Sequence, residues 1–393
     1  MAGPEAKPRL LLLGGDGALS GIPRHLTLLC ETLSPGADIT VLSDRDLGGY
    51  ATLCSQAVRH HEVDGMRNRA GPGTLLRCWR SLRQHLDHGR WDVIWLHERR
   101  PALMLRIAMT LGLWRPSAGP RLALSYHVIP FDPGHRPLLA VLSRWLERWL
   151  LRWGPPMHLV FLTQDMILRL DKVVGNRTLA RHHLHVLSNS SNVGVLPFGP
   201  GAVPRRRDRR HLVITGRAGF QKNYELAARL LAHLPQSYHL TLCGPGTNET
   251  RAQARILRGL APDAQRRIAF AGPVSDVRPL LADADGYVLT SRYEGLPIGA
   301  IEAFEAGLPL MLSPFESAPE MVASHPMALL LTLADLDRDA ARIVELVETY
   351  RQNRPAHAAR IHRAWARKYP YDLWQAQARK LLMDMLRQDT ARA

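Results

Sequence analysis

Residues 286–310, GYVLTSRYEGLPIGAIEAFEAGLPL, decide the fold of this 393-residue chain. The apolar run that ends at Ser291 predicts a buried strand, the Gly/Pro stretch after it predicts a turn, and the apolar, alanine-containing stretch that follows predicts a helix. Two acidic residues, Glu294 in the turn and Glu302 in the helix, lie eight positions apart. The chain has 14 glutamates, so this spacing alone does not identify a site. The predicted strand, turn and helix around the two glutamates provide the more specific evidence.

The same alternation of a short apolar run with a longer helical pattern recurs on both sides of this stretch. Continuous apolar runs bounded by Gly, Ser or His are typical of parallel strands that are buried on both faces. The pattern predicts an α/β fold with two Rossmann-like, doubly wound parallel sheets. The predicted strands are residues 9–14, 38–43, 92–97, 121–127 and 158–163 in the first half, and 211–216, 239–244, 268–272, 286–291, 309–313 and 328–332 in the second.

The domain organisation follows from the length and from one polar segment. Single cores rarely exceed roughly 250–300 residues, which favours two domains. Residues 197–210 are rich in Pro, Gly and Arg and predict an exposed linker. We therefore expect an acceptor-binding domain over 1–200, a donor-binding domain over 201–365, and a last helix over 366–393 that returns to the first domain. Ligands of open α/β sheets bind at the carboxyl ends of the strands, so we expect the two sheets to face each other across a cleft.

The composition excludes several classes of protein. With 46% hydrophobic and 22% charged residues, the chain is core-forming, and its net charge is +16. The basic residues are spread over both halves without a zinc-finger, helix-turn-helix or ribonucleoprotein motif, so no nucleic-acid partner is expected. The four cysteines form no C-x-x-C pair, which fits a reducing, cytoplasmic setting. The longest apolar stretch, 101–114, is interrupted by Arg106 and is too short to span a membrane.

The turn before the predicted helix has the features of an anion site. Gly295 allows close approach of a ligand to the backbone, and a helix N-terminus favours negative charge, so a diphosphate fits there. Eight helical residues span about 12 Å, similar to the reach of a nucleotide sugar from hexose to ribose. One carboxylate of the Glu294/Glu302 pair would then accept hydrogen bonds from the sugar and the other from the ribose. The alternative is a surface glutamate beside a helix-stabilising one.

With these features in place, residues 205–330 resemble the donor-binding domain of the retaining GT-B glycosyltransferases of family 4, the glycosyl transferases group 1. The first half of the chain resembles that family more weakly. The landmarks are Gly216-Arg217 with Lys222-Asn223, Gly244-Pro245-Gly246, the segment 270–274, Ala284-Asp285, and Ser291 with the two glutamates.

The resemblance implies roles for individual residues of the second half. Arg217 and Lys222 would neutralise the donor diphosphate, because a site without a metal needs fixed cations where the leaving charge grows. The backbone near Pro273 and Val274 would contact the base. Glu294 would orient the transferred sugar as a catalytic residue, and Glu302 would hold the ribose. The donor-binding turn consists of Gly295, Leu296 and Pro297.

Two residues of the first half are further candidates. Gly21 lies in a Gly-rich loop that opens a helix after the first predicted strand, a generic phosphate signal, and would approach the donor phosphate or the acceptor. His127 ends the strand 121–127 and matches a family histidine near the reacting sugar, which implies a catalytic role; the alternative is a structural histidine. Residues 195–200 depart from the family, with Phe198 where it usually has Asn.

No metal site is expected from sequence spacing. Two D-x-D triplets occur in the chain. The triplet at 44–46 follows the second predicted strand, 38–43, and the triplet at 283–285 precedes the predicted strand 286–291, so neither is interpreted as a metal–diphosphate motif. His182, His183 and His185 lack the spacing and the carboxylate partners of a zinc site.

Residues 137–153 form a helical pattern with two special stripes. Arg144, Arg148 and Arg152 recur every four residues, beside Trp145 and Trp149. Trp at an apolar boundary with Arg on the polar flank is typical of a helix in a membrane interface. An ordinary domain-packing helix explains the pattern equally well, so both interpretations stay open.

Together these residues and the resemblance imply a metal-independent hexosyltransferase that acts with retention and needs no cofactor. Its co-substrate would be a nucleotide-diphosphate sugar, and its acceptor a lipid-linked glycan or a cell-surface polysaccharide such as a lipopolysaccharide or exopolysaccharide. The enzyme would be cytoplasmic and peripheral on the inner face of the membrane. Two alternatives are an epimerase or hydrolase of nucleotide sugars on the same fold, and a non-catalytic basic scaffold.

Overall fold

The computed structural model describes residues 6–66, 72–116, 119–194 and 208–387. The chain divides into two compact units: unit 1 comprises residues 1–131, 137–188 and 372–393, and unit 2 comprises residues 132–136 and 189–371. The change from unit 1 to unit 2 thus falls at residue 189 rather than at the expected position 201. Most of the expected linker 197–210 lies outside the described residues.

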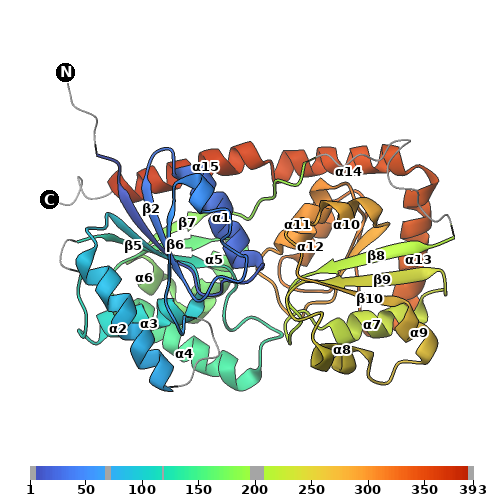
Figure 1. The fold of residues 1–393 in the computed structure, drawn as a ribbon, viewed down its shortest axis with the longest axis horizontal. Coiled ribbons are helices and arrows are strands. Elements are labelled where there is room, and N and C mark those ends of the chain that lie inside the picture. The colour runs from blue at the N-terminus through green and yellow to red at the C-terminus, as the bar shows by residue number, and fades with distance from the viewer. Residues whose placement is uncertain (1–5, 67–71, 117–118, 195–207, 388–393) are drawn as a thin grey trace. The chain divides into compact units, whose positions relative to one another are not determined.

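Unit 1 is built on one seven-stranded parallel sheet with the order β3-β2-β1-β4-β5-β6-β7. One of its inner strands contains the all-leucine run Leu10–Leu13, whose side chains are fully buried because helices cover both faces of the sheet (Figure 1). The strands are β1 (Arg9–Leu13), β2 (Asp38–Ser43), β3 (Arg59–Glu62), β4 (Val93–Leu96), β5 (Arg121–Tyr126), β6 (His158–Phe161) and β7 (His183–Val186).

The two edge strands of this sheet, β3 and β7, were not expected from the sequence. Their sequences, RHHE and HLHV, are polar or alternating, and their side chains are partly exposed. An edge strand pairs on one side alone and is less completely covered, so it carries no continuous apolar run. The five predicted strands are the inner ones, and each is found within a few residues of its expected bounds.

The helices of unit 1 include the last helix of the chain. Helix α15, red in Figure 1, lies beside α1, and the indole Nε1 of Trp374 donates a hydrogen bond to the carbonyl of Ser188 at 2.6 Å. Its buried stripe consists of Trp374, Ala378, Leu381, Leu382 and Met385. The elements are α1 (Gly21–Leu33), η1 (Cys54–Gln56), α2 (Pro72–His88), α3 (Arg99–Thr110), α4 (Pro137–Trp153), α5 (Gln164–Val174), α6 (Asn176–Leu179) and α15 (Tyr371–Arg387).

Unit 2 contains a six-stranded parallel sheet with the order β10-β9-β8-β11-β12-β13. In both sheets the strand order reverses beside the first strand of the unit, which is the doubly wound arrangement. The strands are β8 (Arg210–Thr215), β9 (Tyr238–Cys243), β10 (Ile268–Gly272), β11 (Gly286–Leu289), β12 (Leu310–Leu312) and β13 (Ala328–Leu330). The helices are α7 (Tyr224–His233), α8 (Thr250–Leu257), α9 (Pro262–Arg266), α10 (Arg278–Asp283), α11 (Ile298–Glu305), α12 (Ala318–Ser324), α13 (Leu336–Gln352) and α14 (Arg354–Lys368).

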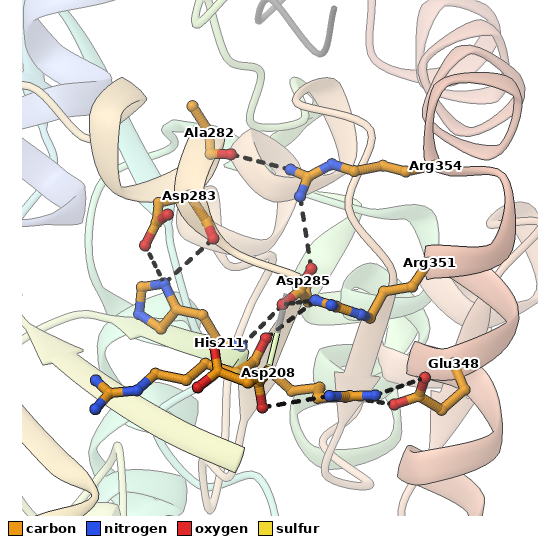
Figure 2. A network of polar contacts seen from close by, with 10 residues as sticks. Asp208, His211, Ala282, Asp283, Asp285, Glu348, Arg351 and Arg354 are labelled. Carbon is orange, nitrogen blue, oxygen red and sulfur yellow. Dashed lines mark hydrogen bonds and ion pairs between the residues drawn. The ribbon is translucent and has the colours of Figure 1, made fainter. Parts of the chain in front are cut away.

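A polar network holds α13 and α14 against the amino ends of β8 and β11 (Figure 2). The buried carboxylate of Asp285 accepts from the backbone N–H of His211 and from Arg351, both at 2.9 Å, and pairs with Arg354 at 3.6 Å. Asp283 pairs with the His211 ring at 2.8 Å. Both carboxylates of the second D-x-D triplet therefore bind protein groups at the edge opposite to the carboxyl ends of the strands.

Candidate functional site

The turn between β11 and α11 surrounds one buried carboxylate. Glu294 is 6% exposed. Its Oε1 accepts hydrogen bonds from Lys222 Nζ and from Ser291 Oγ, both at 2.7 Å, and its Oε2 accepts from Gln221 Nε2 at 3.2 Å. Two residues that are 72 positions apart in the chain thus form an ion pair at the carboxyl end of the sheet, with both carboxylate oxygens engaged.

Two glycines let the loop after β8 bring Lys222 to this place. Gly216 has φ = 137°, and a Cβ atom there would lie 2.4 Å from Lys222 Cε. Gly244 has φ = 138°, and its Cβ would lie 2.2 Å from the carbonyl oxygen of Gly216. The hydroxyl of Tyr224 donates a hydrogen bond to the carbonyl oxygen of Gly216 at 2.6 Å. The loop conformation therefore depends on backbone freedom that L side chains rarely have.

The other donor-site candidates of unit 2 lie at the same edge of the sheet. Arg217 lies two residues after the end of β8 and is exposed. No side chain caps the N-terminus of α11, which leaves its dipole available to an anion. The turn residues Gly295, Leu296 and Pro297 are buried.

Glu302 and the segment after β10 complete the set of candidates in unit 2. Glu302 lies on α11 and is 3% exposed. Burial raises the pKa of the Cys243 thiol to about 11, and the Glu302 carboxylate adds to this rise, so Glu302 lies near the end of β9. Pro273 is exposed and Val274 half-buried directly after β10. The candidates therefore follow, or pack near, the ends of four neighbouring strands.

Three histidines meet at the carboxyl edge of the sheet in unit 1. His127 follows β5, His97 follows β4, and His25 lies on α1. His97 Nδ1 and His127 Nε2 are 3.3 Å apart, and the His25 ring meets the His127 ring edge-on with centroids 4.9 Å apart. Burial lowers the pKa of His97 and of His127 well below the usual range, so both rings are neutral at pH 7. The strand-end argument that selected His127 applies equally to His97.

The glycines of the first loop serve two purposes. A Cβ at Gly15 would lie 2.0 Å from Glu98 Cγ, and one at Gly17 would lie 2.2 Å from the carbonyl oxygen of Arg45, so packing alone requires both glycines. Gly21 is the first residue of α1 and has no atom within 4 Å of the Cβ position. The space beside Gly21 is open to a ligand.

Unit 2 also includes a short segment from the first half of the chain that the sequence analysis missed. The ring of His135 stacks on Tyr293, directly before Glu294, with centroids 3.6 Å apart. Gly134 has φ = 89°, and a Cβ there would lie 2.1 Å from the carbonyl oxygen of Arg292. No periodic or motif signal marks the segment 132–136, because it is a connection between a strand and a helix.

The remaining metal-like motifs bind other protein groups. Asp44 Oδ1 accepts from the backbone N–H of Arg45 at 2.8 Å, and Asp46 Oδ1 from that of Gly48 at 2.9 Å. His182 Nδ1 accepts from the backbone N–H of Met157 at 3.2 Å. These side chains hold turns and strand ends together.

Helix α4 buries a narrow face and exposes its apolar stripe. The buried face includes Glu147, which pairs with Arg106 at 2.9 Å, and the side chains of Ser143, Leu150 and Leu151. The exposed fraction reaches 86% for Leu138, 63% for Trp145 and 64% for Trp153, whereas Trp149 is half-buried. Arg144, Arg148 and Arg152 are exposed. Among the described helices, none is long and apolar enough to cross a membrane.

Comparisons with known proteins agree with this arrangement. A family model described as glycosyl transferases group 1 matches residues 209–349. The chain is 21% identical over 283 residues to the UDP-Gal:alpha-D-GlcNAc-diphosphoundecaprenol alpha-1,3-galactosyltransferase of Escherichia coli, covering 68% of this chain and 69% of that protein. The chain spans 16% to 69% of the length of the curated relatives that it matches.

Solved structures match nearly the whole chain. The crystal structure of Anabaena HepE in complex with UDP-glucose has a TM-score of 0.74 at 16% identity and covers 96% of this chain and 99% of that one. The crystal structure of WaaG, a glycosyltransferase involved in lipopolysaccharide biosynthesis, has a TM-score of 0.69 at 15% identity and covers 94% and 98%. The chain therefore has the GT-B fold, and residues 209–349 of unit 2 match the family model of the glycosyl transferases group 1.

Proposed function

We propose that this protein is a retaining glycosyltransferase that moves a hexose-type sugar from a nucleoside-diphosphate sugar to a lipid-linked or cell-surface glycan. The observation that carries the proposal is the ion pair between half-buried Lys222 and buried Glu294, 2.7 Å apart, beside the uncapped N-terminus of α11. It lies within the part of the chain that the family model matches. A cation, a carboxylate and a helix dipole at one strand end suit a sugar linked to a diphosphate.

In this proposal the ion pair changes partners when the donor binds. Lys222 now neutralises the buried carboxylate of Glu294. The ammonium group has three protons, so it can turn one of them to a phosphate oxygen while Glu294 accepts from a sugar hydroxyl. Arg217 adds a second cation for the diphosphate, and Glu302 accepts from the ribose. The backbone of the turn 295–297 and of Pro273 and Val274 would hold the diphosphate and the base.

Transfer then breaks the bond between the sugar C1 and the phosphate oxygen and forms a bond between C1 and the acceptor oxygen on the same face. The acceptor proton goes to the departing phosphate. Arg217, Lys222 and the dipole of α11 stabilise the negative charge that grows on this phosphate, without a metal ion. His127, as a neutral imidazole, hydrogen-bonds the reacting sugar, and the open space at Gly21 receives a phosphate or the acceptor.

The names of similar proteins support the choice of substrates. The Escherichia coli relative is named for a UDP-galactose donor and a diphosphoundecaprenol-linked acceptor, and HepE was solved with UDP-glucose. A lipid-linked acceptor requires an enzyme that works at a membrane surface, and we propose the inner face of the membrane. The exposed Leu/Trp stripe of α4, flanked by arginines, fits an anionic bilayer surface, and the net charge of +16 favours the same partner.

The test combines donor binding with product analysis. Ligands that bind the folded state raise its melting temperature, so a panel of UDP-, GDP-, ADP- and TDP-sugars should contain one donor that stabilises the protein. We expect Glu294→Gln and Lys222→Met to lower turnover by orders of magnitude. The matched control is Lys368→Met, which removes a surface pair with Glu320 (2.9 Å) in the same unit and should leave turnover unchanged.

The alternative functions give different results in this test. An epimerase or hydrolase would convert the nucleotide sugar into an epimer or a free sugar. It would transfer no sugar to polyprenyl-diphosphate-linked acceptors, and that product pattern would contradict the transferase proposal. A non-catalytic scaffold would show no rise in melting temperature with any of the donors. Lys222→Met and Lys368→Met would then also give the same turnover as each other.

A further inference from the structure

The three histidines of unit 1 form the strongest cluster of metal-ligating side chains among the described residues. One ligand atom each from His25, His97 and His127 lies within 4.8 Å of the others. The elements that carry them follow β1, β4 and β5, which are neighbours in the sheet, so the fold itself brings the rings together. His25 and His97 are each 3% exposed, and His127 is half-buried.

The chemistry of this cluster is that of an imidazole metal site. Imidazole is the commonest metal-ligating side chain in proteins, and each ring offers two nitrogen atoms. Three imidazoles with one open coordination position are a known donor set for Zn²⁺, whereas Mg²⁺ prefers oxygen ligands.

The spacing of the rings suits one ion after small movements. Three nitrogen ligands at about 2.0–2.1 Å from a tetrahedral ion lie roughly 3.3 Å from one another. His97 Nδ1 and His127 Nε2 are already 3.3 Å apart, and no ligand atom of the cluster is more than 4.8 Å from another. Side-chain rotation of His25 is therefore the main adjustment needed.

We propose that His25, His97 and His127 bind one ion of the Zn²⁺, Co²⁺ or Ni²⁺ class, and that the bound ion inhibits sugar transfer. Inhibition follows because an imidazole nitrogen that is bound to the ion cannot hydrogen-bond the sugar. This second part rests on the proposed function of His127, whereas metal binding itself does not. Sequence spacing could not indicate the site, since its ligands are separated by 72 and 30 residues.

The binding test uses Co²⁺ and the full chain. We expect one equivalent of Co²⁺ to give the visible d–d absorption of a four-coordinate site, and Zn²⁺ to displace it. His25→Gln should weaken Co²⁺ binding by at least about tenfold, and His97→Gln provides a second variant if the first fails to fold. The matched control is His185→Gln, which removes a histidine 3.0 Å from His158 on the neighbouring strand and should bind Co²⁺ like the unmodified protein.

The activity test separates this proposal from the function on which it partly rests. Micromolar Zn²⁺ should suppress transfer by the unmodified protein, EDTA should restore it, and His25→Gln should keep its basal activity and resist Zn²⁺. Absence of a Co²⁺ site, or equal binding by His25→Gln and the unmodified protein, would overturn the metal site while leaving basal transfer intact. Failure of the proposed function would instead remove basal transfer and leave Co²⁺ binding unchanged.

Discussion

At the scale of single residues, the candidate donor site depends on a carboxylate that is already satisfied before a ligand arrives. Glu294 receives hydrogen bonds from Lys222, Ser291 and Gln221. The ion pair with Lys222 keeps the buried Glu294 charge from being unpaired in a low-dielectric site. The arrangement holds the lysine and the glutamate in one fixed geometry, which is the property that a preorganised binding site requires.

Gly216 offers a test of this geometry that leaves both charged residues in place. Gly216→Ala should weaken donor binding by at least about tenfold, because its φ of 137° is unfavourable for alanine and its Cβ would lie 2.4 Å from Lys222 Cε. The measurement is the donor-induced rise in melting temperature. Gly219→Ala, in the same loop, has no atom within 4 Å of its Cβ and serves as the control. Equal effects of the two variants would contradict the proposed dependence.

His325 predicts a pH dependence of stability. Burial lowers its pKa to about 3, and the backbone N–H of Met327 donates to Nδ1 while Nε2 faces the carbonyl of Leu308. An unfolded histidine titrates near 6.5, so between that pH and about 3 the unfolded state binds one proton more than the folded state. The free energy of unfolding should therefore fall as the pH falls through this window, by up to about 1.4 kcal/mol per pH unit from this group.

The measurement is the urea midpoint of the protein between pH 7 and pH 5. His325→Asn should unfold at lower urea at pH 7, since it loses buried contacts, but its midpoint should change less with pH. A slope that is the same in both proteins would show that another group controls the acid sensitivity.

The three histidines differ in how far the sequence alone could identify them. His127 was identified from its place at a strand end and from resemblance, and the same argument would have selected His97. His25 lies on a helix and carries no such signal. Its nearness to the other two rings depends on how α1 packs on the sheet, which is set by contacts between residues far apart in the chain.

At the scale of elements, burial decides which strands could be predicted. Strands β1, β4 and β5 are covered on both faces and show continuous apolar runs, whereas β3 and β7 lie at the edges and contain RHHE and HLHV. The turn between β11 and α11 was predictable because a buried strand, a Gly/Pro turn and a helix follow one another in one stretch. The segment 132–136 was not, since its place beside Tyr293 depends on tertiary packing alone.

Helix α4 is the element for which the sequence left two interpretations open. Its apolar stripe remains exposed, with Leu138 at 86%, and its arginines face solvent, which supports our membrane proposal. Trp145→Ser together with Trp153→Ser should weaken binding to vesicles that contain phosphatidylglycerol by at least about tenfold, because indole rings bind at the bilayer interface.

Sedimentation with these vesicles and with phosphatidylcholine vesicles measures the effect. A matched control replaces two exposed leucines of other helices, Leu168→Ser with Leu373→Ser, at 54% and 50% exposure. Vesicle binding that survives the tryptophan changes in a folded protein would leave α4 as a solvent-exposed helix without a membrane role.

At the scale of the whole molecule, the chain builds unit 1 from three separate segments. Residues 1–131, 137–188 and 372–393 contribute to it, with unit 2 inserted between the last two. The buried stripe of α15 includes Trp374 at 2% exposure. Unit 1 thus depends on the end of the chain for part of its core.

This dependence gives a prediction with two neighbouring residues. Trp374→Ala should lower the free energy of unfolding by about 3–5 kcal/mol, since it removes a buried indole and its hydrogen bond to Ser188. Leu373→Ala, at 50% exposure, should change it by less than about 0.5 kcal/mol. Chemical denaturation followed by tryptophan fluorescence measures both variants. Similar losses for the two would mean that α15 contributes little to unit 1.

The insertion of unit 2 also has a consequence for how the protein is made in the cell. The 183 residues from Asn189 to Tyr371 must leave the ribosome before α15 is available to cover unit 1. At about 5–20 residues per second this takes roughly 10 to 40 s. During that time the nascent first unit exposes the apolar surface that Trp374, Leu381 and Met385 later cover. Chaperone demand during synthesis should therefore be greatest for unit 1, although its strands are translated first.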